Sequence, residues 1–226
     1  PSLSIIIPTL NVANSLAATI DCLELGKSKF DMEIIVADCG SVDGTQKLAE
    51  GLDLRLVQSA RGRGNQMAAG VEKSLGEWII FLHADTVLEA GWVAEILGFI
   101  ERDDAKSLGA YFKFSLDDEH PKAIRMAGVV AWRARTFGLP YGDQGFFISR
   151  TYLDEVGGIS KIPLMEDVDL VRRVGRRNLY ALETKSITSA IRYLKGGYYR
   201  RASFHLFCLF LYFIGVPVKF IARIYG

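Results

Sequence analysis

Short apolar runs alternate with amphipathic stretches through the first hundred residues. Four runs rich in Ile, Val, Leu and Phe have the length and composition of buried strands, at residues 3–7, 33–37, 54–57 and 79–82. Each is followed by a stretch with helical spacing, at residues 13–25, 46–51, the segment up to Ser74, and 91–100. This alternation predicts an α/β fold in which a parallel sheet has helices on both faces.

The pattern changes after Arg102. It predicts two further strands and two further helices, with a helical turn between them; the strands are 108–114 and 144–149, the helices 121–137 and 166–177, and the turn 152–156. Acidic residues open the helix at 166 and arginines close it, which matches the helix dipole.

The C-terminal segment, residues 202–218, is almost wholly apolar apart from Ser203 and His205, and Gly215 and Pro217 interrupt it. About 17 apolar residues is the lower limit for crossing a bilayer. A helix in the membrane interface, or one packed on a membrane partner, fits at least as well. We favour membrane contact, with a buried core or dimer helix as the alternative.

Composition narrows the range of partners. The 226 residues carry a net charge of +1, which gives no reason to expect nucleic acid as a partner. Basic residues crowd the last third, however, which favours an anionic ligand or membrane surface there; they are Arg172, Arg173, Arg176, Arg177, Arg192, Lys195, Arg200 and Arg201. The three cysteines have no metal-ligand spacing, and residues 1–10 lack a secretory pattern, so we expect a cytoplasmic protein.

Polar residues follow the predicted strands, at the edge where an open α/β sheet binds ligands. Asp85 ends the fourth strand and suits Mg²⁺ or Mn²⁺ bound to phosphate, although it could instead cap the helix at 91–100. Asp38 could accept a hydrogen bond from a ribose or a base, and Gly40 lets the backbone approach a ligand. Arg63, in a glycine-flanked loop before a helix, could hold a diphosphate.

Other residues give weaker signals. Glu166 and Asp167 could merely offset a helix dipole, and a catalytic role needs one of them to face a cleft as a general base. The histidines are too scattered for a zinc site, and we expect His205 to be a packing residue.

The order of these motifs is more specific than any one of them. Pro8-Thr9-Leu10-Asn11, the segment from Asp38 to Thr45, Phe81-Leu82-His83-Ala84-Asp85, Gly157-Gly158 and Glu166-Asp167 occur in that order. Over residues 3–180 the chain resembles the inverting family 2 glycosyltransferases of GT-A fold. The resemblance implies a Rossmann-like, mixed but mainly parallel sheet flanked by helices, followed by a C-terminal apolar helical appendage.

The resemblance also implies roles for individual residues. Asp85 would bind Mn²⁺ or Mg²⁺, Asp167 would be the catalytic base with Glu166 beside it, and the nucleotide-sugar donor would contact Pro8, Thr9, Leu10, Asn11, Asp38, Gly40, Arg63, Ala84, Asp85, Arg200 and Arg201. The segment 141–145 is similar to the acceptor side of a bacterial subgroup with a His-Ala-Asp metal motif. Asp143 and Gln144, with Gly158, would then bind the acceptor.

Two residues depart from the family pattern. His83 stands where the family often has the first acid of its metal motif, so the metal would rely on phosphate oxygens or be assisted by His83. Cys39 stands where a second acid often follows Asp38.

We therefore expect an enzyme that transfers a sugar from a nucleotide-diphosphate sugar to a hydroxyl acceptor with inversion. Residues 1–104 would bind the donor, 105–190 the acceptor, and 191–226 would form a helical segment at the cytoplasmic face of the membrane, which suggests a lipid-linked acceptor. The alternatives are an inactive nucleotide-sugar-binding or membrane-scaffold protein, and a sugar-phosphate nucleotidyltransferase. The latter usually has a glycine-rich basic loop after the first strand, which Pro8 to Asn11 do not provide.

Overall fold

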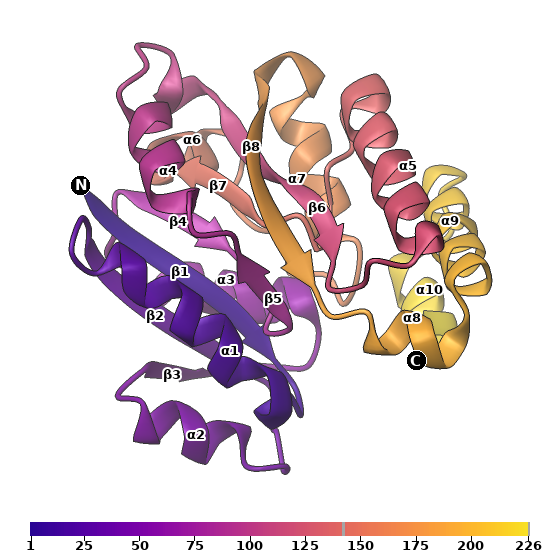
Figure 1. Cartoon of the computed structure of the whole chain (residues 1–226), viewed down its shortest axis with the longest axis horizontal. Helices are drawn as coiled ribbons and strands as arrows, with labels where there is room; N and C mark the ends of the chain where they lie inside the picture. Colours follow the sequence, from indigo (N-terminus) through magenta and orange to yellow (C-terminus); the bar gives the residue numbers. More distant parts are fainter. Residues whose placement is uncertain (142, 226) are drawn as a thin grey trace.

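The computed structural model describes residues 1–141 and 143–225 and contains one eight-stranded sheet (Figure 1). Its order is β3-β2-β1-β4-β7-β6-β8-β5. The pairs β1–β2, β2–β3, β1–β4 and β6–β8 are parallel, and β4–β7, β6–β7 and β5–β8 are antiparallel. The strands are β1 (Ser2–Thr9), β2 (Asp31–Asp38), β3 (Arg55–Gln58), β4 (Trp78–Phe81), β5 (Thr86–Leu88), β6 (Gly109–Leu116), β7 (Phe146–Ser149) and β8 (Leu179–Thr188). The predicted mixed, mainly parallel sheet is confirmed.

Helices cover both faces of this sheet. They are α1 (Ala13–Leu23), α2 (Thr45–Gly51), α3 (Arg63–Lys73), α4 (Trp92–Ile100), α5 (Pro121–Phe137), α6 (Arg150–Glu155), α7 (Glu166–Val174), α8 (Ile191–Gly196), α9 (Tyr198–Phe213) and α10 (Val218–Tyr225). Short 3₁₀ turns lie at Glu24–Gly26, Ala105–Ser107 and Arg176–Asn178. Apolar residues of α1 and α4 share one core, whereas those of α3, α6 and α7 share the core on the opposite face.

Alternation along β1 and β4 explains the unbroken apolar runs Ile5–Ile7 of β1 and Trp78–Phe81 of β4. Ile5 and Ile80 belong to the core under α1 and α4, while their neighbours Ile6 and Ile79 belong to the core under α3 and α7. Successive side chains of a strand point to opposite faces, so a strand covered on both sides needs apolar residues at every position.

The sheet contains two strands that the sequence pattern does not predict, β5 and β8. The buried side chains of β8 include Thr184, Ser186 and Thr188, so the inward face of this strand is largely polar. An apolar alternation is therefore weak in this strand, although β8 pairs along most of β6. By contrast, the predicted bounds of the helix at 121–137 are those observed for α5.

The C-terminal segment forms three helices at one edge of the molecule, where α9 lies beside α5 and α10 folds back against α9 (Figure 1). Pro217 separates α9 from α10, as its lack of an N–H and its ring predict. Within residues 1–141 and 143–225, no helix combines the length and the apolar character needed to cross a membrane.

Close packing joins the start of α3 to the loop before α7. The backbone N–H of Gly64 donates to the Ile162 carbonyl at 3.1 Å. A Cβ atom on Gly64 would lie 2.4 Å from the carbonyl oxygens of both Ser160 and Ile162. Only glycine therefore allows this approach, which sets the position of Arg63 relative to α7.

We predict that Gly64→Ala lowers the free energy of unfolding by about 1–3 kcal/mol, because the added methyl group forces two backbone segments apart. Gly98→Ala is the matched control: Gly98 lies within α4, and nothing would lie within 4 Å of its new Cβ atom. That change should be neutral or stabilise by up to about 1 kcal/mol. Denaturant unfolding measures both; equal effects of the two substitutions would contradict the packing argument.

Candidate active site

A cleft of about 330 Å³ lies at the carboxyl ends of β1 and β4. We call it the strand-end cleft. The loop after β1, the loop after β2, the start of α3, the end of β4 and the C-terminal helices contribute its lining. Of the predicted donor-binding residues, it contains Pro8, Thr9, Leu10, Arg63, Ala84 and Asp85. Strand ends that are distant in sequence thus meet at one sheet edge, as expected for an open α/β sheet.

Asp85 does not cap a helix. It precedes β5, and α4 begins after Gly91 without a side-chain hydrogen bond at its N-cap. One carboxylate oxygen of Asp85 lies 3.9 Å from an Nη atom of Arg192. The backbone carbonyl of Asp85 accepts from the Ser189 N–H at 3.0 Å, which fixes the loop that carries the carboxylate.

His83 forms an ion pair with Asp143, at 2.8 Å between Nδ1 and Oδ1. Burial alone would lower the pKa of His83, but the hydrogen bond and charge of Asp143 outweigh it and raise the pKa. Burial likewise opposes ionisation of Asp143, but His83 lowers the pKa of this carboxyl to about 2. The pair connects the end of β4 to the segment before β7. Asp143, which the sequence suggested as an acceptor-binding residue, thus contacts His83 of the His-Ala-Asp motif.

The side chains beside Asp85 can hold a divalent cation only with help from a ligand. Among the described residues, no group of three or more His, Cys, Asp or Glu side chains could enclose a metal. Asp85 offers one carboxylate, and His83 offers Nε2, since Nδ1 is held by Asp143. This small set fits Mg²⁺ or Mn²⁺, which keep several waters and bind through one or two carboxylates plus substrate phosphates.

Arg63, whose side chain is 30% exposed, forms an ion pair with Glu166, at 3.1 Å between Nε and Oε1. Glu166 is fully buried. Burial raises the pKa of Glu166 to about 7 against the attraction of Arg63. Burial also disfavours the charge on Arg63, yet Glu166 and Asp167 outweigh it, so the pKa of Arg63 is raised. Arg63 is therefore always charged, and the carboxyl beside it takes up a proton near neutral pH.

Asp167, not Glu166, lines the open space next to this pair. Asp167 faces two cavities, whereas Glu166 lines only the smaller one, beneath Pro8 and His83. Met165, which precedes them, has a φ of +65°, unusual for a residue with a side chain. This left-handed residue ends the loop abruptly and starts α7 with Glu166 directed inward and Asp167 toward the cavities.

Asp38 organises a loop. Its buried carboxylate accepts hydrogen bonds from the hydroxyl of Thr9 (2.8 Å), the N–H and hydroxyl of Ser41, the N–H of Gly40 and the amide of Gln46. Burial opposes ionisation, but these donors hold the pKa of Asp38 below its usual range. The expected contact of this carboxylate with a nucleoside stays a prediction: in the structure these five donors hold the loop on Asp38, and its neighbour Cys39 lines the cleft.

Asn11 and Gly40 also serve this loop. Asn11 accepts from the Val42 N–H at 2.9 Å, and its own N–H donates to the Ser41 hydroxyl at 2.8 Å. Gly40 has a φ of +98°, which favours glycine. Neither residue lines the strand-end cleft, so their contribution to ligand binding is to hold its wall.

Two expected acceptor residues have structural roles. The buried amide of Gln144 donates to the Phe112 carbonyl at 3.2 Å and accepts from Arg133 at 3.4 Å. Gly158, with a φ of +67°, ends α6 by donating its N–H to the Leu153 carbonyl at 2.8 Å. Neither lines the cavities beside Asp167, so their expected contact with an acceptor stays a prediction. Gly142, in the same predicted segment, lies outside the described residues.

The C-terminal helices contribute more of the site than the sequence suggests. Arg201 lines the space around Asp85 and Asp143, and its buried Nε has no hydrogen-bond partner within the described chain. Arg200 is exposed and does not line this space. Of the two arginines expected to contact the donor, only Arg201 therefore faces the site. His205, expected to be a packing residue, faces the site, and its Nε2 lies 3.3 Å from the Tyr225 hydroxyl.

Sequence reasoning missed Arg192, Arg133, Tyr193 and Tyr225 as site residues, although all four line the cavities. Arg192 belonged to the basic cluster noted in the sequence, which is the one signal that could have identified it. The other three lie on helices for which only packing against the rest of the molecule decides which side chains face inward, so local sequence does not mark them.

The sequence profile described as "Glycosyl transferase family 2" matches residues 4–157, more than half of the chain. The chain belongs to glycosyltransferase family 2. A PGL/p-HBAD biosynthesis glycosyltransferase of Mycobacterium bovis is 36% identical over 116 residues, 48% of this chain and 45% of that protein. The amylovoran biosynthesis glycosyltransferase AmsB of Erwinia amylovora is 33% identical over 112 residues, 45% of this chain and 36% of that protein. The chain thus matches less than half the length of these relatives.

Solved structures place this family 2 chain in the GT-A fold. Glucosyl-3-phosphoglycerate synthase of Mycobacterium tuberculosis, crystallised with Mn²⁺, UDP and phosphoglyceric acid, has a TM-score of 0.61 at 17% identity, over 96% of this chain and 79% of that one. TarS 1-349 of S. aureus in complex with UDP has a TM-score of 0.61 at 16% identity, over 84% of this chain and 61% of that one. At such identities the likeness establishes the fold alone.

The raised pKa of Glu166 predicts a pH-dependent stability. A carboxyl with a pKa of about 7 when folded and 4.5 when unfolded stabilises below pH 4.5 and loses that contribution as the pH rises to 7. The shift corresponds to about 3 kcal/mol. Between pH 4.5 and 7.5 the unfolding free energy of the wild type should therefore fall by about 3 kcal/mol more than that of Glu166→Gln. Denaturant titrations at several pH values measure the difference, and parallel curves for the two proteins would contradict it.

Proposed function

We propose that this chain transfers a sugar from a nucleotide-diphosphate sugar to an acceptor hydroxyl, with inversion and with the help of Mg²⁺ or Mn²⁺. The observation that carries the proposal is the meeting of Asp85, Arg63 and Asp167 around connected cavities in a member of family 2. Residues 1–104 would supply most of the donor site. Residues 105–190 would supply most of the acceptor site, and residues from 191 onward would close it.

The leaving diphosphate needs positive charge where its own charge develops. Arg63 at the start of α3 supplies one such charge, and Arg192 and Arg201 face the same space from α8 and α9. A cation on Asp85, with His83 Nε2 as a second ligand, would neutralise the phosphates further. The nucleoside would lie along the wall formed by Pro8, Thr9 and Leu10 and the loop that Asp38 holds.

Asp167 is the residue we assign as base. The acceptor hydroxyl must lose its proton as it attacks the sugar carbon from the face opposite the diphosphate, and a carboxylate within reach can take that proton. Glu166 is less suited, since it is paired with Arg63 and fully buried. Its role would be to hold Arg63 at the junction of the donor and acceptor sites.

The alternative functions have less support. Membership of glycosyltransferase family 2 does not favour a nucleotidyltransferase. The loop after β1 also lacks the glycine-rich basic sequence that such an enzyme usually has. An inactive binding or scaffold protein would have no use for a carboxylate directed into the cavities beside the cation site.

We predict that Asp85→Asn abolishes the increase in UDP affinity that Mn²⁺ produces.

Asp167→Asn should leave UDP binding within about twofold but lower turnover by a factor of about 10²–10⁴. Calorimetry with UDP and Mn²⁺, and release of UDP from a panel of labelled UDP-, GDP- and TDP-sugars with mixed acceptors, measure the two effects. Asp154→Asn, an exposed carboxylate of α6, is the control and should change neither. Unchanged turnover in Asp167→Asn would refute the assignment of the base.

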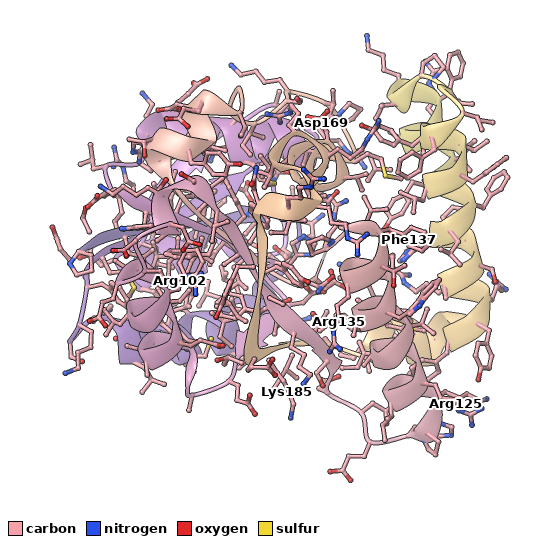
Figure 2. All side chains as sticks on the ribbon, turned by 90° about the horizontal axis from the view of Figure 1, so that it is seen from above. Arg102, Arg125, Arg135, Phe137, Asp169 and Lys185 are labelled. Atoms are coloured by element: carbon pink, nitrogen blue, oxygen red, sulfur yellow. The ribbon has the colours of Figure 1, made fainter. Side chains whose placement is uncertain are left out.

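The C-terminal helices support a peripheral location on a membrane surface. Exposed apolar side chains gather on α5 and α8–α10, among them Trp132, Phe137, Leu194, Phe207, Phe210, Phe213, Ile214, Phe220 and Ile224. Figure 2 shows α5 and α9 side by side at the edge of the molecule, with Arg125 near one end of α5 and Phe137 near the other. We call this surface the apolar face; so large a patch marks an interaction site.

Charge makes an anionic lipid surface the best partner for the apolar face. Neither residues 121–137 nor residues 189–226 contain a single Asp or Glu, whereas together they contain Lys122, Arg125, Arg133, Arg135, Arg192, Lys195, Arg200, Arg201, Lys219 and Arg223. Several basic groups lie over aromatic rings of the face: Arg172 over Phe213 at 5.2 Å and Arg223 over Phe220 at 5.7 Å. Basic groups flanking exposed aromatics are typical of interfacial helices.

Trp132 is a natural reporter of this contact. It is 58% exposed, whereas Trp78 and Trp92, the other two tryptophans, are buried. We predict that phosphatidylglycerol vesicles shift the tryptophan emission to shorter wavelength and that the shift weakens with salt. Trp132→Phe should lose the shift but still sediment with the vesicles. If the wild type neither sediments nor shifts at low salt, the apolar face does not bind membranes.

A further inference from the structure

A second cavity, of about 100 Å³, lies between the C-terminal helices and the rest of the molecule. We call it the inner cavity. Asp167, the proposed base, lines it, and so do Arg63 and Tyr225, which also line the strand-end cleft. Leu164 also lines both spaces, so they adjoin at these three side chains, and a molecule in the inner cavity would lie beside the proposed base and next to the donor site.

One part of the inner cavity is polar. Arg133 reaches it from α5, with its guanidinium stacked over Tyr141 at 3.7 Å. Its Nε donates to the Leu139 carbonyl at 3.1 Å and one Nη to Gln144 at 3.4 Å. Among the described residues these bonds take two of the five N–H groups of the guanidinium. Asp143, Tyr193 and His205 add further polar groups. This part suits a hydroxyl-bearing head group.

The remaining wall is apolar. It consists of Phe114, Val130, Leu164, Met165, Cys208 and Leu209. Cavities lined by such side chains bind small apolar groups; an engineered one of about 150 Å³ takes benzene. A cavity that combines the two linings suits a molecule with a hydroxyl-bearing end and an apolar end.

Two helices of the inner cavity also carry the apolar face. On α5, Val130 lines the cavity, whereas its neighbour Val129 is exposed. On α9, Cys208 lines the cavity, whereas Phe207 is exposed. The same two helices thus separate a proposed membrane surface from the proposed base by one helix thickness.

From this arrangement we propose that the acceptor is an amphiphile taken from the membrane. Its hydroxyl-bearing head lies beside Asp167 and Arg133, and the apolar part next to the head lies against Val130, Cys208 and Leu209. This inference rests on the proposed function, since it names the acceptor of that reaction. The chemistry adds no further step: the hydroxyl oxygen bonds to the sugar carbon, the bond from that carbon to the diphosphate breaks, and the proton goes to Asp167.

Binding of alkyl glycosides below their micelle concentration tests the inference without knowledge of the natural acceptor. Calorimetry would compare octyl β-glucoside with methyl β-glucoside, each added to the enzyme loaded with UDP and Mn²⁺. We expect the octyl compound to bind with one-to-one stoichiometry and at least tenfold more tightly. Val130→Trp, which fills the cavity, should weaken octyl binding at least tenfold, whereas Val129→Trp should leave it within twofold.

Cys208→Phe fills the same space from α9. It replaces Val130→Trp in the test if Val130→Trp does not unfold cooperatively near the unfolding temperature of the wild type. Equal affinities for the two glycosides, or equal effects of the substitutions at 129 and 130, would overturn the inference. Loading with UDP is measured first and separately. If UDP does not bind in the presence of Mn²⁺, the proposed function fails, whatever the glycosides do.

Discussion

The ion pair of Arg63 and the buried Glu166 is the contact on which the site depends. Arg63 starts α3, which packs on β1 and β2, and Glu166 starts α7, which packs on the opposite half of the sheet. Removing Arg63 would leave the buried carboxyl of Glu166 without its partner, which is costly. The pair therefore holds the start of α3 against the start of α7, and the close approach at Gly64 allows the two helix ends to meet.

A second polar link acts in parallel. His83, at the end of β4, is tied to Asp143, just before β7, so the antiparallel pairing of β4 with β7 continues as an ion pair beyond the strands. Both links combine a residue from the first hundred with one from the second hundred. The site is thus assembled from both halves at the same time, and each link restricts where the other can lie.

Sequence reasoning recovered the parallel first half because its strands are covered on both faces and its helices alternate regularly with them. Asp85, Arg63 and Asp167, which the sequence motifs single out, line the cavities, because strand ends and helix starts are marked by local pattern. Strand β8 was missed because its inward residues are threonine and serine, which give no apolar alternation. His205, Tyr225 and Arg133 were missed because their helices could turn any face inward, and only packing against the sheet decides which one. The loop-holding role of Asp38 was not foreseen, since a buried carboxylate that accepts from five donors and an open one look alike in sequence.

That saturated carboxylate has a consequence for recognition. Thr9, Gly40, Ser41 and Gln46 are all anchored to Asp38 before any ligand arrives, so the wall of the strand-end cleft has little conformational freedom left to lose. Ordering of flexible loops often consumes much of the binding free energy of a ligand. Here discrimination between nucleotide bases would come from the fixed shape of the backbone in this wall. Conformational adaptation to the ligand would be confined to the helices on the opposite side of the cleft.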